Sequence, residues 1–371
     1  MENSRITVEM LEDFLYTYGP YEELNRNYYL THRRFMPESM IPAYLLQPVV
    51  INPLDLRNIT EDVAKHTPSF FFNLSKSFKE HHFFSPNLDI YIQKQPRYAY
   101  SPRVDHQYYE ICYQYTGESV LKLYAEDDWE EIILRTGDFL FIPVAQSHDV
   151  TIDSDAILLN IGIKSSTFAH AFSHNIPDDS ILGQFFTQLL FSNDRNIRYI
   201  LFHAAANAAM KQIVQNLSLT YCTHTIYSQQ MMNLQLSILF INLLQNHSYN
   251  AKIGSNEYGI NRKIPAVMQY IEQNYTHITV QDIADQFGYS NDYLNQIFKK
   301  VTTHTLGETL SNLKIQKAGA LLISTDIPVS SIAEYLGYRD TTSLIRSFKK
   351  YYGLTPLQYR KTYGKEEKFE G

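Results

Sequence analysis

The sequence predicts an α+β multidomain protein. An antiparallel β-barrel with flanking helices should precede an all-α domain with two helix-turn-helix units. Three observations support this prediction. The chain has 371 residues, which suggests two or three domains at about 150 residues each. Short β-rich runs lie close together in its middle, and one helical pattern occurs twice near its end.

The composition excludes several classes of protein. With 44% hydrophobic and 19% charged residues, the chain has enough apolar material for packed cores, which argues against intrinsic disorder. Cys112 and Cys222 are the two cysteines, so we expect neither a disulfide framework nor a cysteine-built zinc site. The first residues lack the regions of a signal peptide, and polar residues interrupt the richest apolar run, Leu234–Leu244. We therefore expect a cytoplasmic protein without a membrane partner.

Within the first 165 residues the sequence pattern changes from helical to β-rich. Residues 1–85 contain helical patterns at residues 8–19 and 61–78, and we interpret them as a mostly helical N-terminal extension. Residues 86–165 contain runs such as LDIYIQK, YYEICYQY and AILLNIGI, with Thr-Gly turn signals between several of them. Many short strands at such spacing are typical of an antiparallel sandwich or barrel.

Residues 166–247 return to helical patterns, and the last helix carries two apolar stripes. The first stripe is Met232, Leu236, Leu239 and Leu243; the second is Met231, Leu234, Ile238 and Ile241. Two stripes indicate burial on more than one side. Packing on the chain's own barrel explains one stripe and a second subunit would explain the other, so we expect a dimerisation region; the alternative is a wholly intramolecular core helix. Residues 248–261 are small, polar and Gly-containing, which predicts a linker.

Charge divides unevenly along the chain. The formal net charge is −7, but residues 262–361 contain 12 Lys+Arg and 8 Asp+Glu, which leaves −11 for the remainder. A basic C-terminal segment on an acidic body fits a DNA-binding domain that is carried by a different module.

That C-terminal segment contains one helix–turn–helix pattern twice. In each copy an Ile-Ala pair precedes a turn glycine, and a second amphipathic helix buries a Leu and a Phe. The residues are Ile283, Ala284, Gly288, Leu294 and Phe298 in the first copy, and Ile332, Ala333, Gly337, Leu344 and Phe348 in the second. Thr279, with Asp282 three residues later, can cap the first helix. A small Ala where two helices cross and a Gly turn are what a helix-turn-helix requires.

The end of this segment resembles the AraC/XylS family of transcription regulators. In FKKYYGLTPLQYRK, five residues stand where the family places them: Gly353, Thr355, Pro356, Tyr359 and Arg360. LKIQKAGALL matches the helix that joins the family's two units. Thr303, Lys314 and the pair Ser343-Leu344 depart from the family pattern, which affects packing details rather than the fold. The resemblance covers about a hundred residues, 262–363, and leaves 364–371 as a tail.

The resemblance implies that the second helix of each unit lies in a major groove of double-stranded DNA. Outward-facing candidates for base contacts are Asn291, Asp292, Asn295 and Gln296 in the first unit, and Thr341, Thr342, Ile345 and Arg346 in the second. Asn and Gln suit adenine, Asp suits cytosine, Arg suits guanine, and Ile suits the thymine methyl group. Lys299 and Lys349 are placed to contact phosphates; the alternative is solvated charge. The two helices would reach grooves roughly 34 Å apart.

The β-rich middle resembles the two cupin motifs. His106 and Glu110 lie in the first motif and His148 in the second. In catalytic cupins these positions hold a metal, but Val104 stands where the first histidine is usual and Ala145 where glycine is usual. We therefore expect no metal, no cofactor and no catalytic residue here. Strand alternation puts His106, Tyr108, Glu110 and Cys112 on one face.

Many AraC-like regulators carry such a barrel as a sensor, which implies that His106, Tyr108, Glu110 and His148 contact a small-molecule effector, with a sugar as one candidate. The alternative is that they hydrogen-bond within a filled barrel. The resulting hypothesis is a homodimeric transcription regulator, an activator by family habit, that acts with the transcription machinery and is not an enzyme. The other hypotheses are a metal-dependent cupin enzyme fused to a DNA-binding domain, and an effector-independent DNA-binding protein.

Overall fold

The structure is a computed structural model that describes residues 7–40, 77–78, 84, 88–125, 128–173, 183, 186, 197–223, 225–248, 251–255, 264–302 and 304–364. The chain divides into two compact units. The N-terminal unit contains residues 1–175 and 190–258, and the C-terminal unit contains residues 176–189 and 259–371. The division at residue 258 falls inside the segment that was predicted to be a linker.

The strands of the N-terminal unit form two sheets among the described residues. They are β1 (Ser77–Phe78), β2 (Ile90–Lys94), β3 (Ala99–His106), β4 (Tyr109–Thr116), β5 (Glu118–Tyr124), β6 (Trp129–Arg135), β7 (Phe139–Ile142), β8 (His148–Ile152), β9 (Ile157–Ile163), β10 (Ile197–Phe202) and β11 (Lys252–Ser255). In this part of the chain one sheet has the order β1-β3-β8-β5-β6 and the other has the order β11-β10-β7-β4-β9-β2. The pairings are antiparallel except for β1 with β3. The predicted antiparallel β architecture is confirmed, as two facing sheets.

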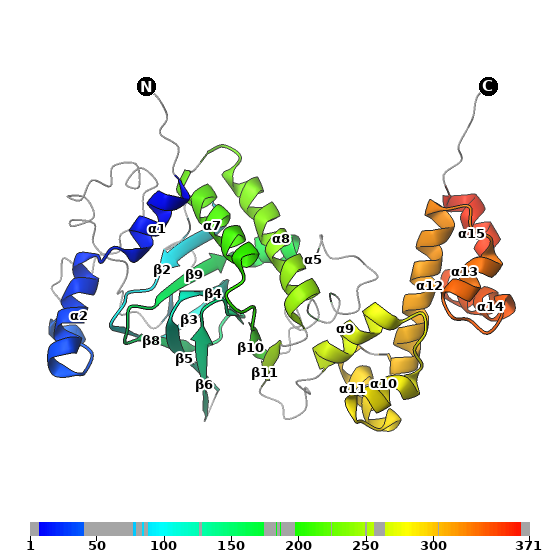
Figure 1. The fold of residues 1–371 in the computed structure, drawn as a ribbon, viewed down its shortest axis with the longest axis horizontal. Helices are drawn as coiled ribbons and strands as arrows, with labels where there is room; N and C mark the ends of the chain where they lie inside the picture. Colours follow the sequence, from blue (N-terminus) through cyan, green and yellow to red (C-terminus); the bar gives the residue numbers. More distant parts are fainter. Residues whose placement is uncertain are drawn as a thin grey trace. The chain divides into compact units, whose positions relative to one another are not determined.

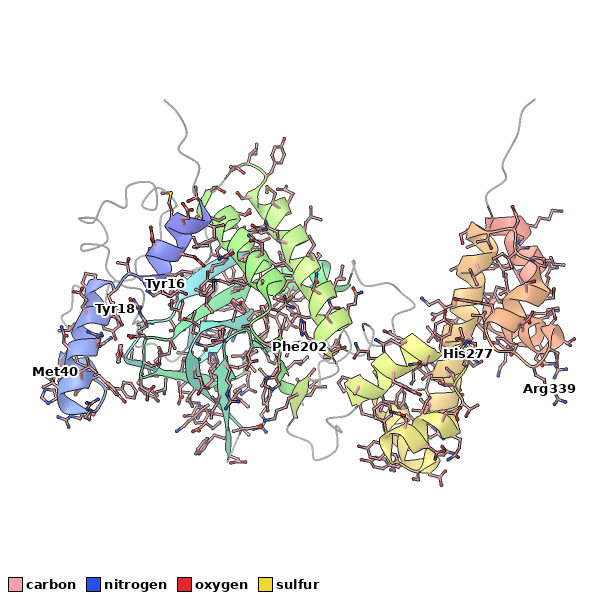
Figure 2. All side chains as sticks on the ribbon, viewed as in Figure 1. Tyr16, Tyr18, Met40, Phe202, His277 and Arg339 are labelled. Atoms are coloured by element: carbon pink, nitrogen blue, oxygen red, sulfur yellow. The ribbon has the colours of Figure 1, made fainter. Side chains whose placement is uncertain are left out.

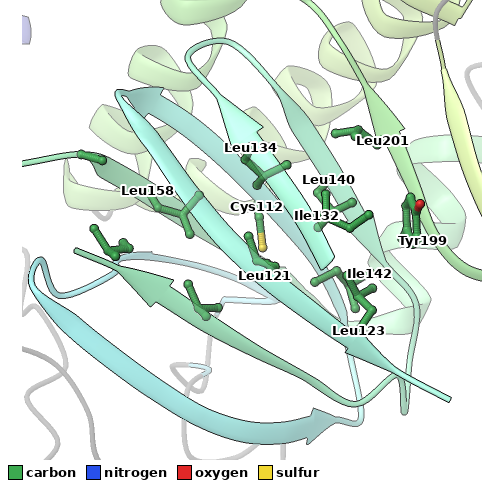
Figure 3. Packing of buried hydrophobic residues seen from close by; sticks show 13 residues of the cluster. Cys112, Leu121, Leu123, Ile132, Leu134, Leu140, Ile142, Leu158, Tyr199 and Leu201 are labelled. Atoms are coloured by element: carbon green, nitrogen blue, oxygen red, sulfur yellow. The ribbon is translucent and has the colours of Figure 1, made fainter. Parts of the chain in front are cut away.

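The two sheets enclose a hydrophobic core, shown in Figure 3. One sheet contributes Leu121, Leu123, Ile132, Leu134, Val150 and Ile152, and the other contributes Cys112, Leu140, Ile142, Leu158, Tyr199 and Leu201. β5 alternates between buried and more exposed residues because one of its faces meets this core and the other meets solvent. β4 and β9 are buried along nearly their whole length, since helices cover their second face.

The helices of this unit are α1 (Val8–Tyr16), α2 (Pro20–His32), the 3-10 helix η1 (Glu38–Met40), α5 (Ser165–Ser173), α7 (Ala208–Thr223) and α8 (Ser228–His247). Figure 1 shows α7 and α8 against the sheet that contains β2, β9 and β4. Phe240 of α8 contacts Phe141 of β7 and Phe168 of α5, with ring centroids 5.7 and 5.3 Å apart. The helices therefore complete a second apolar layer behind the six-stranded sheet.

The two predicted stripes of α8 have different environments. The stripe of Met232, Leu236, Leu239 and Leu243 is buried. The other stripe is exposed, with exposed fractions of 47% for Met231, 62% for Leu234, 49% for Ile238 and 39% for Ile241. α8 thus buries one apolar stripe in its own unit and leaves the second on the surface.

Buried charges attach α2 to the sheets. Glu22 of α2 accepts hydrogen bonds from Lys94 Nζ and Arg97 Nη2, both at 2.9 Å, and the three side chains are largely buried. Arg97 also donates to the carbonyl of Tyr16, which Figure 2 labels beside α1. Part of the predicted helical extension is therefore packed on the β-sheets. The helix predicted over 61–78 is wrong at residues 77–78, which pair with β3 as the strand β1; the rest of that prediction lies outside the described residues.

Besides β1, two more strands lie where the sequence predicts none. β10 falls in the segment predicted to be helical, and β11 falls in the segment predicted to be a linker; they pair with each other and extend the sheet beyond β7. Tyr199 of β10 joins the core and packs on Gly254 of β11, where a Cβ atom would lie 2.0 Å from the Tyr199 ring. Burial of these short segments by distant partners explains why they are strands.

The C-terminal unit is helical, as predicted. Its helices are α9 (Ile264–Asn274), α10 (Val280–Phe287), α11 (Asn291–Thr302), α12 (Leu306–Ser324), α13 (Val329–Tyr335), α14 (Thr341–Tyr352) and α15 (Pro356–Tyr363). Figure 1 shows α12 running from the group α9–α11 to the group α13–α15. The helix pairs α10–α11 and α13–α14 are the two predicted helix-turn-helix units.

Local signals account for the boundaries of these helices. Thr279 caps α10 in a reciprocal pair with Asp282, as predicted. Gly288 ends α10 with φ of +71° and Gly337 follows α13 with φ of +68°, a conformation that favours glycine. A Cβ atom on Gly337 would also lie 1.9 Å from the carbonyl oxygen of Thr276. In the part of the chain that the structure describes, no helix is long and apolar enough to cross a membrane.

Candidate functional sites

A cluster of ionisable side chains lies between the two sheets of the N-terminal unit. Glu110 on β4 is 2% exposed, and its Oε2 lies 3.2 Å from His106 Nε2 and 3.1 Å from His148 Nε2. Both histidines are buried, and their rings are 5.2 Å apart. The three residues come from β3, β4 and β8, so both sheets build this polar cluster.

The electrostatics of the cluster favour a charged pair. Burial alone would raise the pKa of Glu110, but the charges and hydrogen bonds of His106 and His148 hold it well below its usual value. Burial alone would lower the pKa of His148, but the hydrogen bond and the charge of Glu110, with the hydrogen bond to Gln146 and the charge of Asp149, together outweigh burial and raise it. His148 Nδ1 also lies 3.3 Å from the carbonyl oxygen of Gln146. With acceptors at both ring nitrogens, the protonated form of His148 is favoured.

Tyrosines complete the cluster on one side. The Tyr108 ring stacks on His106 with centroids 4.6 Å apart, and its hydroxyl accepts a hydrogen bond from Tyr91 at 3.0 Å. Burial raises the pKa of Tyr108 and of Tyr91, so both phenols stay protonated. The structure thus brings the predicted residues His106, Tyr108, Glu110 and His148 together.

The prediction that His106 to Cys112 form one strand is wrong. The chain leaves β3 at His106, turns through Gln107 and Tyr108, and enters β4 at Tyr109 in the other sheet. His106 still meets Glu110, because β3 and β4 face each other across the core. Because only Gln107 and Tyr108 connect the two strands, His106 and Glu110 still point into the same interior, as they would on one strand.

Two further residues belong to the interior around this cluster. Tyr91 lies over Gly162, which is paired with Glu110 across β4 and β9. Asn160 is buried beside Cys112, and its Oδ1 is a buried oxygen without a hydrogen-bond partner among the described residues. Sequence reasoning missed both, because they belong to strands with no motif. A polar Asn within the apolar run AILLNIGI was the one available signal.

The same cluster has the donor set of a metal site. One ligand atom from each of His106, Glu110 and His148 lies within 4.8 Å of the others. Two imidazoles and a carboxylate, with further coordination positions open, suit zinc, iron or manganese. These residues therefore fit a divalent transition metal, although the sequence led us to expect none.

The second helix of the first helix-turn-helix unit, α11, presents fewer polar groups than predicted. Asp292, Gln296 and Lys299 are exposed, but Asn291 and Asn295 are half-buried. Asn291 Nδ2 donates to Gln281 Oε1 at 2.7 Å, and Asn295 Oδ1 accepts from the backbone N–H of Leu306 at 3.1 Å. The prediction that all four candidate base contacts face outward is therefore wrong for Asn291 and Asn295, which bond to neighbouring helices.

The equivalent helix of the second unit, α14, matches the prediction more closely. Thr342, Ile345, Arg346 and Lys349 are exposed, and Thr341 is half-buried at the first turn. Asp340 caps the helix by accepting from Ser343 N at 2.7 Å. Arg339, which the sequence reading did not single out, is exposed just before this cap (Figure 2). Its position directly before Asp340, the residue that caps α14, could have pointed to it.

Comparisons with known proteins agree with this geometry. A model of the family described as a helix-turn-helix domain matches residues 283–362. The multiple antibiotic resistance protein MarA of Escherichia coli is 30% identical over 100 residues, which cover 27% of this chain and 79% of MarA. The chain belongs to the AraC/XylS family. It is accordingly a DNA-binding transcription regulator.

Two other regulators match over a smaller share of their own length. RafR, the raffinose operon transcriptional regulatory protein of Pediococcus pentosaceus, is 30% identical over 130 residues, 34% of this chain and 45% of RafR. The HTH-type transcriptional regulator YtdP of Bacillus subtilis is 36% identical over 110 residues, but these are 14% of YtdP. A solved structure of ToxT from Vibrio cholerae matches 74% of this chain and 98% of that chain at 15% identity, with a TM-score of 0.28.

Proposed function

We propose that this AraC/XylS-family protein binds DNA sequence-specifically under the control of a small molecule held at the polar cluster. The observation that carries the proposal is the burial of His106, Tyr108, Glu110 and His148 at one place between two sheets. A buried ionic cluster is a weak source of stability, because apolar residues of similar volume often stabilise a core as well or better. Perturbed, mutually bonded ionisable groups are typical of a binding site.

The chemistry of the cluster fits a ligand rich in hydroxyl groups. Glu110 and the Asn160 carbonyl oxygen can accept hydrogen bonds, while the imidazoles and the Tyr108 hydroxyl can donate or accept them. The adjacent apolar core would cover the nonpolar faces of such a ligand. Two relatives are named as regulators of raffinose and lactose operons. A carbohydrate is therefore the first class to test.

Thermal denaturation of the full-length protein with raffinose, lactose or xylose tests the site. At 100 times its Kd a ligand should stabilise the wild type by about 2.7 kcal/mol, and Glu110→Gln should abolish the shift. Ser119→Ala is a matched control, because it removes a buried hydrogen bond to Gln114 at the other end of the core and should keep the shift. Equal shifts in all three proteins contradict the site. No shift with any metabolite would favour the effector-independent regulator.

The DNA-binding side of the proposal concerns α11 and α14. Their exposed residues would contact base edges in two successive major grooves of double-stranded DNA, and the protein would act as an activator with the transcription machinery. The effector would alter the placement of the C-terminal unit through residues 256–261, the part of the predicted linker that follows β11. Selection of bound duplexes from a random pool tests specific binding; enrichment of no motif would contradict it.

We further propose a homodimer formed through α8. Met231, Leu234, Ile238 and Ile241 are exposed on one stripe and repeat every three and four residues, the spacing of a coiled-coil seam. A second copy offers the same stripe, so the contact is self-complementary. Leu234→Glu should convert the dimer to a monomer in sedimentation velocity, whereas Asn246→Glu, at an exposed position more than one turn beyond the stripe, should not. A wild-type monomer at every concentration would overturn this proposal.

A second candidate function is a metal-dependent cupin enzyme joined to a DNA-binding domain. The convergence of three ligand atoms within 4.8 Å favours it. Stoichiometric iron, manganese or zinc in the purified protein, lost in His148→Ala, would support this function. Substoichiometric metal that is unchanged in His148→Ala would argue against it.

A further inference from the structure

We propose that the second helix-turn-helix unit carries most of the base preference of this protein, and that Asn291 and Asn295 of the first unit are positioning residues. The inference rests on the proposed sequence-specific DNA binding and divides it between the two units. The two units share one fold but differ in which polar groups of α11 and α14 are available.

Asn295 fastens α11 to α12. Its Oδ1 accepts a hydrogen bond from the backbone N–H of Leu306, the first residue of α12, at 3.1 Å. The first N–H groups of a helix have no partner inside the helix, and Thr305 satisfies a different one, that of Glu308. Asn295 therefore satisfies an N–H group at the start of α12 and helps to fix the angle between α11 and α12.

Asn291 couples α11 to α10. Its Nδ2 donates to Gln281 Oε1 at 2.7 Å, and Gln281 Nε2 donates onward to Asp285 at 2.8 Å. The Asn291 Oδ1 atom is itself buried. An asparagine reads adenine by offering both its carbonyl oxygen and its amide nitrogen to the groove. In this arrangement Asn291 offers neither freely, so it holds the two helices together.

Apart from Asn291 and Asn295, the first unit has few groups that would attract DNA. Gln296 is exposed and can contact a base, and Lys299 can contact a phosphate. Against these, α10 and α11 contain three acidic residues, Asp282, Asp285 and Asp292, and two basic ones, Lys299 and Lys300. A net negative unit gains less from phosphate neutralisation than a positive one.

The second unit has the opposite balance. From α13 to α14 the acidic residues are Glu334 and Asp340, and the basic residues are Arg339, Arg346, Lys349 and Lys350. Arg346 is exposed beside Thr342 and Ile345 on one side of α14. A pair of hydrogen bonds from arginine to guanine is the commonest specific protein–DNA contact. The second unit therefore has both the stronger phosphate attraction and the stronger reading group.

The inference predicts an asymmetric DNA site with one strongly preferred block and one weakly preferred block, about one helical turn apart. Selection from random duplexes, with full-length wild type, Arg346→Ala and Gln296→Ala, tests this. Arg346→Ala should remove preference at a position in the strong block, with a loss of about 5- to 150-fold for the preferred base, and Gln296→Ala should alter the weak block alone. Two equally strong blocks would overturn the inference and leave the proposed function intact; absence of any motif would overturn both.

Binding of Asn295→Ala and Asn295→Asp to the selected duplex and to its single-base variants tests the positioning role. An aspartate keeps an acceptor for Leu306 N–H but cannot donate to adenine. We expect Asn295→Ala to weaken binding to every duplex by a similar factor, and Asn295→Asp to retain the wild-type order of base preferences at every position. Loss of preference at one base pair in both variants, or unchanged binding in Asn295→Ala, would overturn this role.

Discussion

Two groups of polar side chains among the described residues, one in each unit, differ in their surroundings. In the N-terminal unit, His106, Glu110 and His148 are buried and bond to one another. On α14 of the C-terminal unit, Arg346 and Lys349 are exposed. Removing one partner of a buried ionic pair destabilises the fold, because the other charge stays buried. Removing an exposed side chain leaves the fold nearly unchanged and alters what the surface binds. Substitutions at the two places should therefore separate stability from DNA affinity.

The largest effect is expected at Glu22, another buried charge of the N-terminal unit. Glu22→Gln leaves Lys94 and Arg97 buried without their carboxylate, and should lower the free energy of unfolding by about 3–5 kcal/mol. Glu118→Gln is the exposed control: its ion pair with Arg135 lies on the surface, and its loss should cost at most about 1 kcal/mol. Chemical denaturation measures both; equal stability of the two variants would contradict the comparison.

The same carboxylate predicts how stability changes with pH. Burial raises the pKa of Glu22, but Lys94 and Arg97 outweigh burial and hold it below the ordinary 4.5. Because the pKa is lower in the folded state, ionised Glu22 stabilises the fold above about pH 4.5, and this contribution is lost as the pH falls through the folded pKa. Stability measured from pH 6 downward should fall more steeply for wild type than for Glu22→Gln. If the stability of both proteins fell equally with pH, titratable groups other than Glu22 would cause the loss of stability in acid.

An intermediate effect is expected at Arg346, on DNA binding alone. Arg346→Ala should weaken binding to the preferred duplex by about 1–3 kcal/mol and relax one position of the site. The melting temperature should match the wild type, since Arg346 is exposed. Fluorescence anisotropy with preferred and single-base variant duplexes gives the measurement. A uniform loss on every duplex would make Arg346 a phosphate contact.

The smallest effect is expected at Lys349. Its exposed ammonium follows Arg346 on α14 and would neutralise one phosphate. Lys349→Ala should weaken binding similarly on all duplexes and reduce the slope of log affinity against log salt by about 1. An unchanged slope would place Lys349 away from DNA.

The sequence predicted the C-terminal unit well because its signals are local. Thr279, Asp282 and Gly288 lie within ten residues of one another and define the start and end of α10. The buried Leu294 and Phe298 then place α11 against the domain. Each signal acts within one or two turns of helix, so the boundaries needed no knowledge of distant parts of the chain.

Predictions that depend on distant contacts were less successful. β10 and β11 are short, and their partners lie far away along the chain. The run IRYILF of β10 is rich in residues that favour strands, but it stands alone among helical patterns. On a helical wheel Asn295 lies outside the buried side of Leu294 and Phe298. The backbone N–H of Leu306 at the start of α12 nevertheless donates a hydrogen bond to it. The four residues of the polar cluster lie together as expected, although His106 was predicted on the same strand as Glu110 and lies at the end of β3, in the other sheet.

The most direct test of the account is whether a ligand at the buried cluster changes DNA binding in the other unit. Affinity of the full-length protein for its selected duplex would be measured with and without a panel of metabolites that includes raffinose, lactose and xylose, for wild type, Glu110→Gln and Ser119→Ala. The account predicts that one metabolite changes the affinity of wild type and Ser119→Ala at least tenfold and leaves Glu110→Gln unaffected. Wild-type affinity that is the same with every metabolite would contradict it.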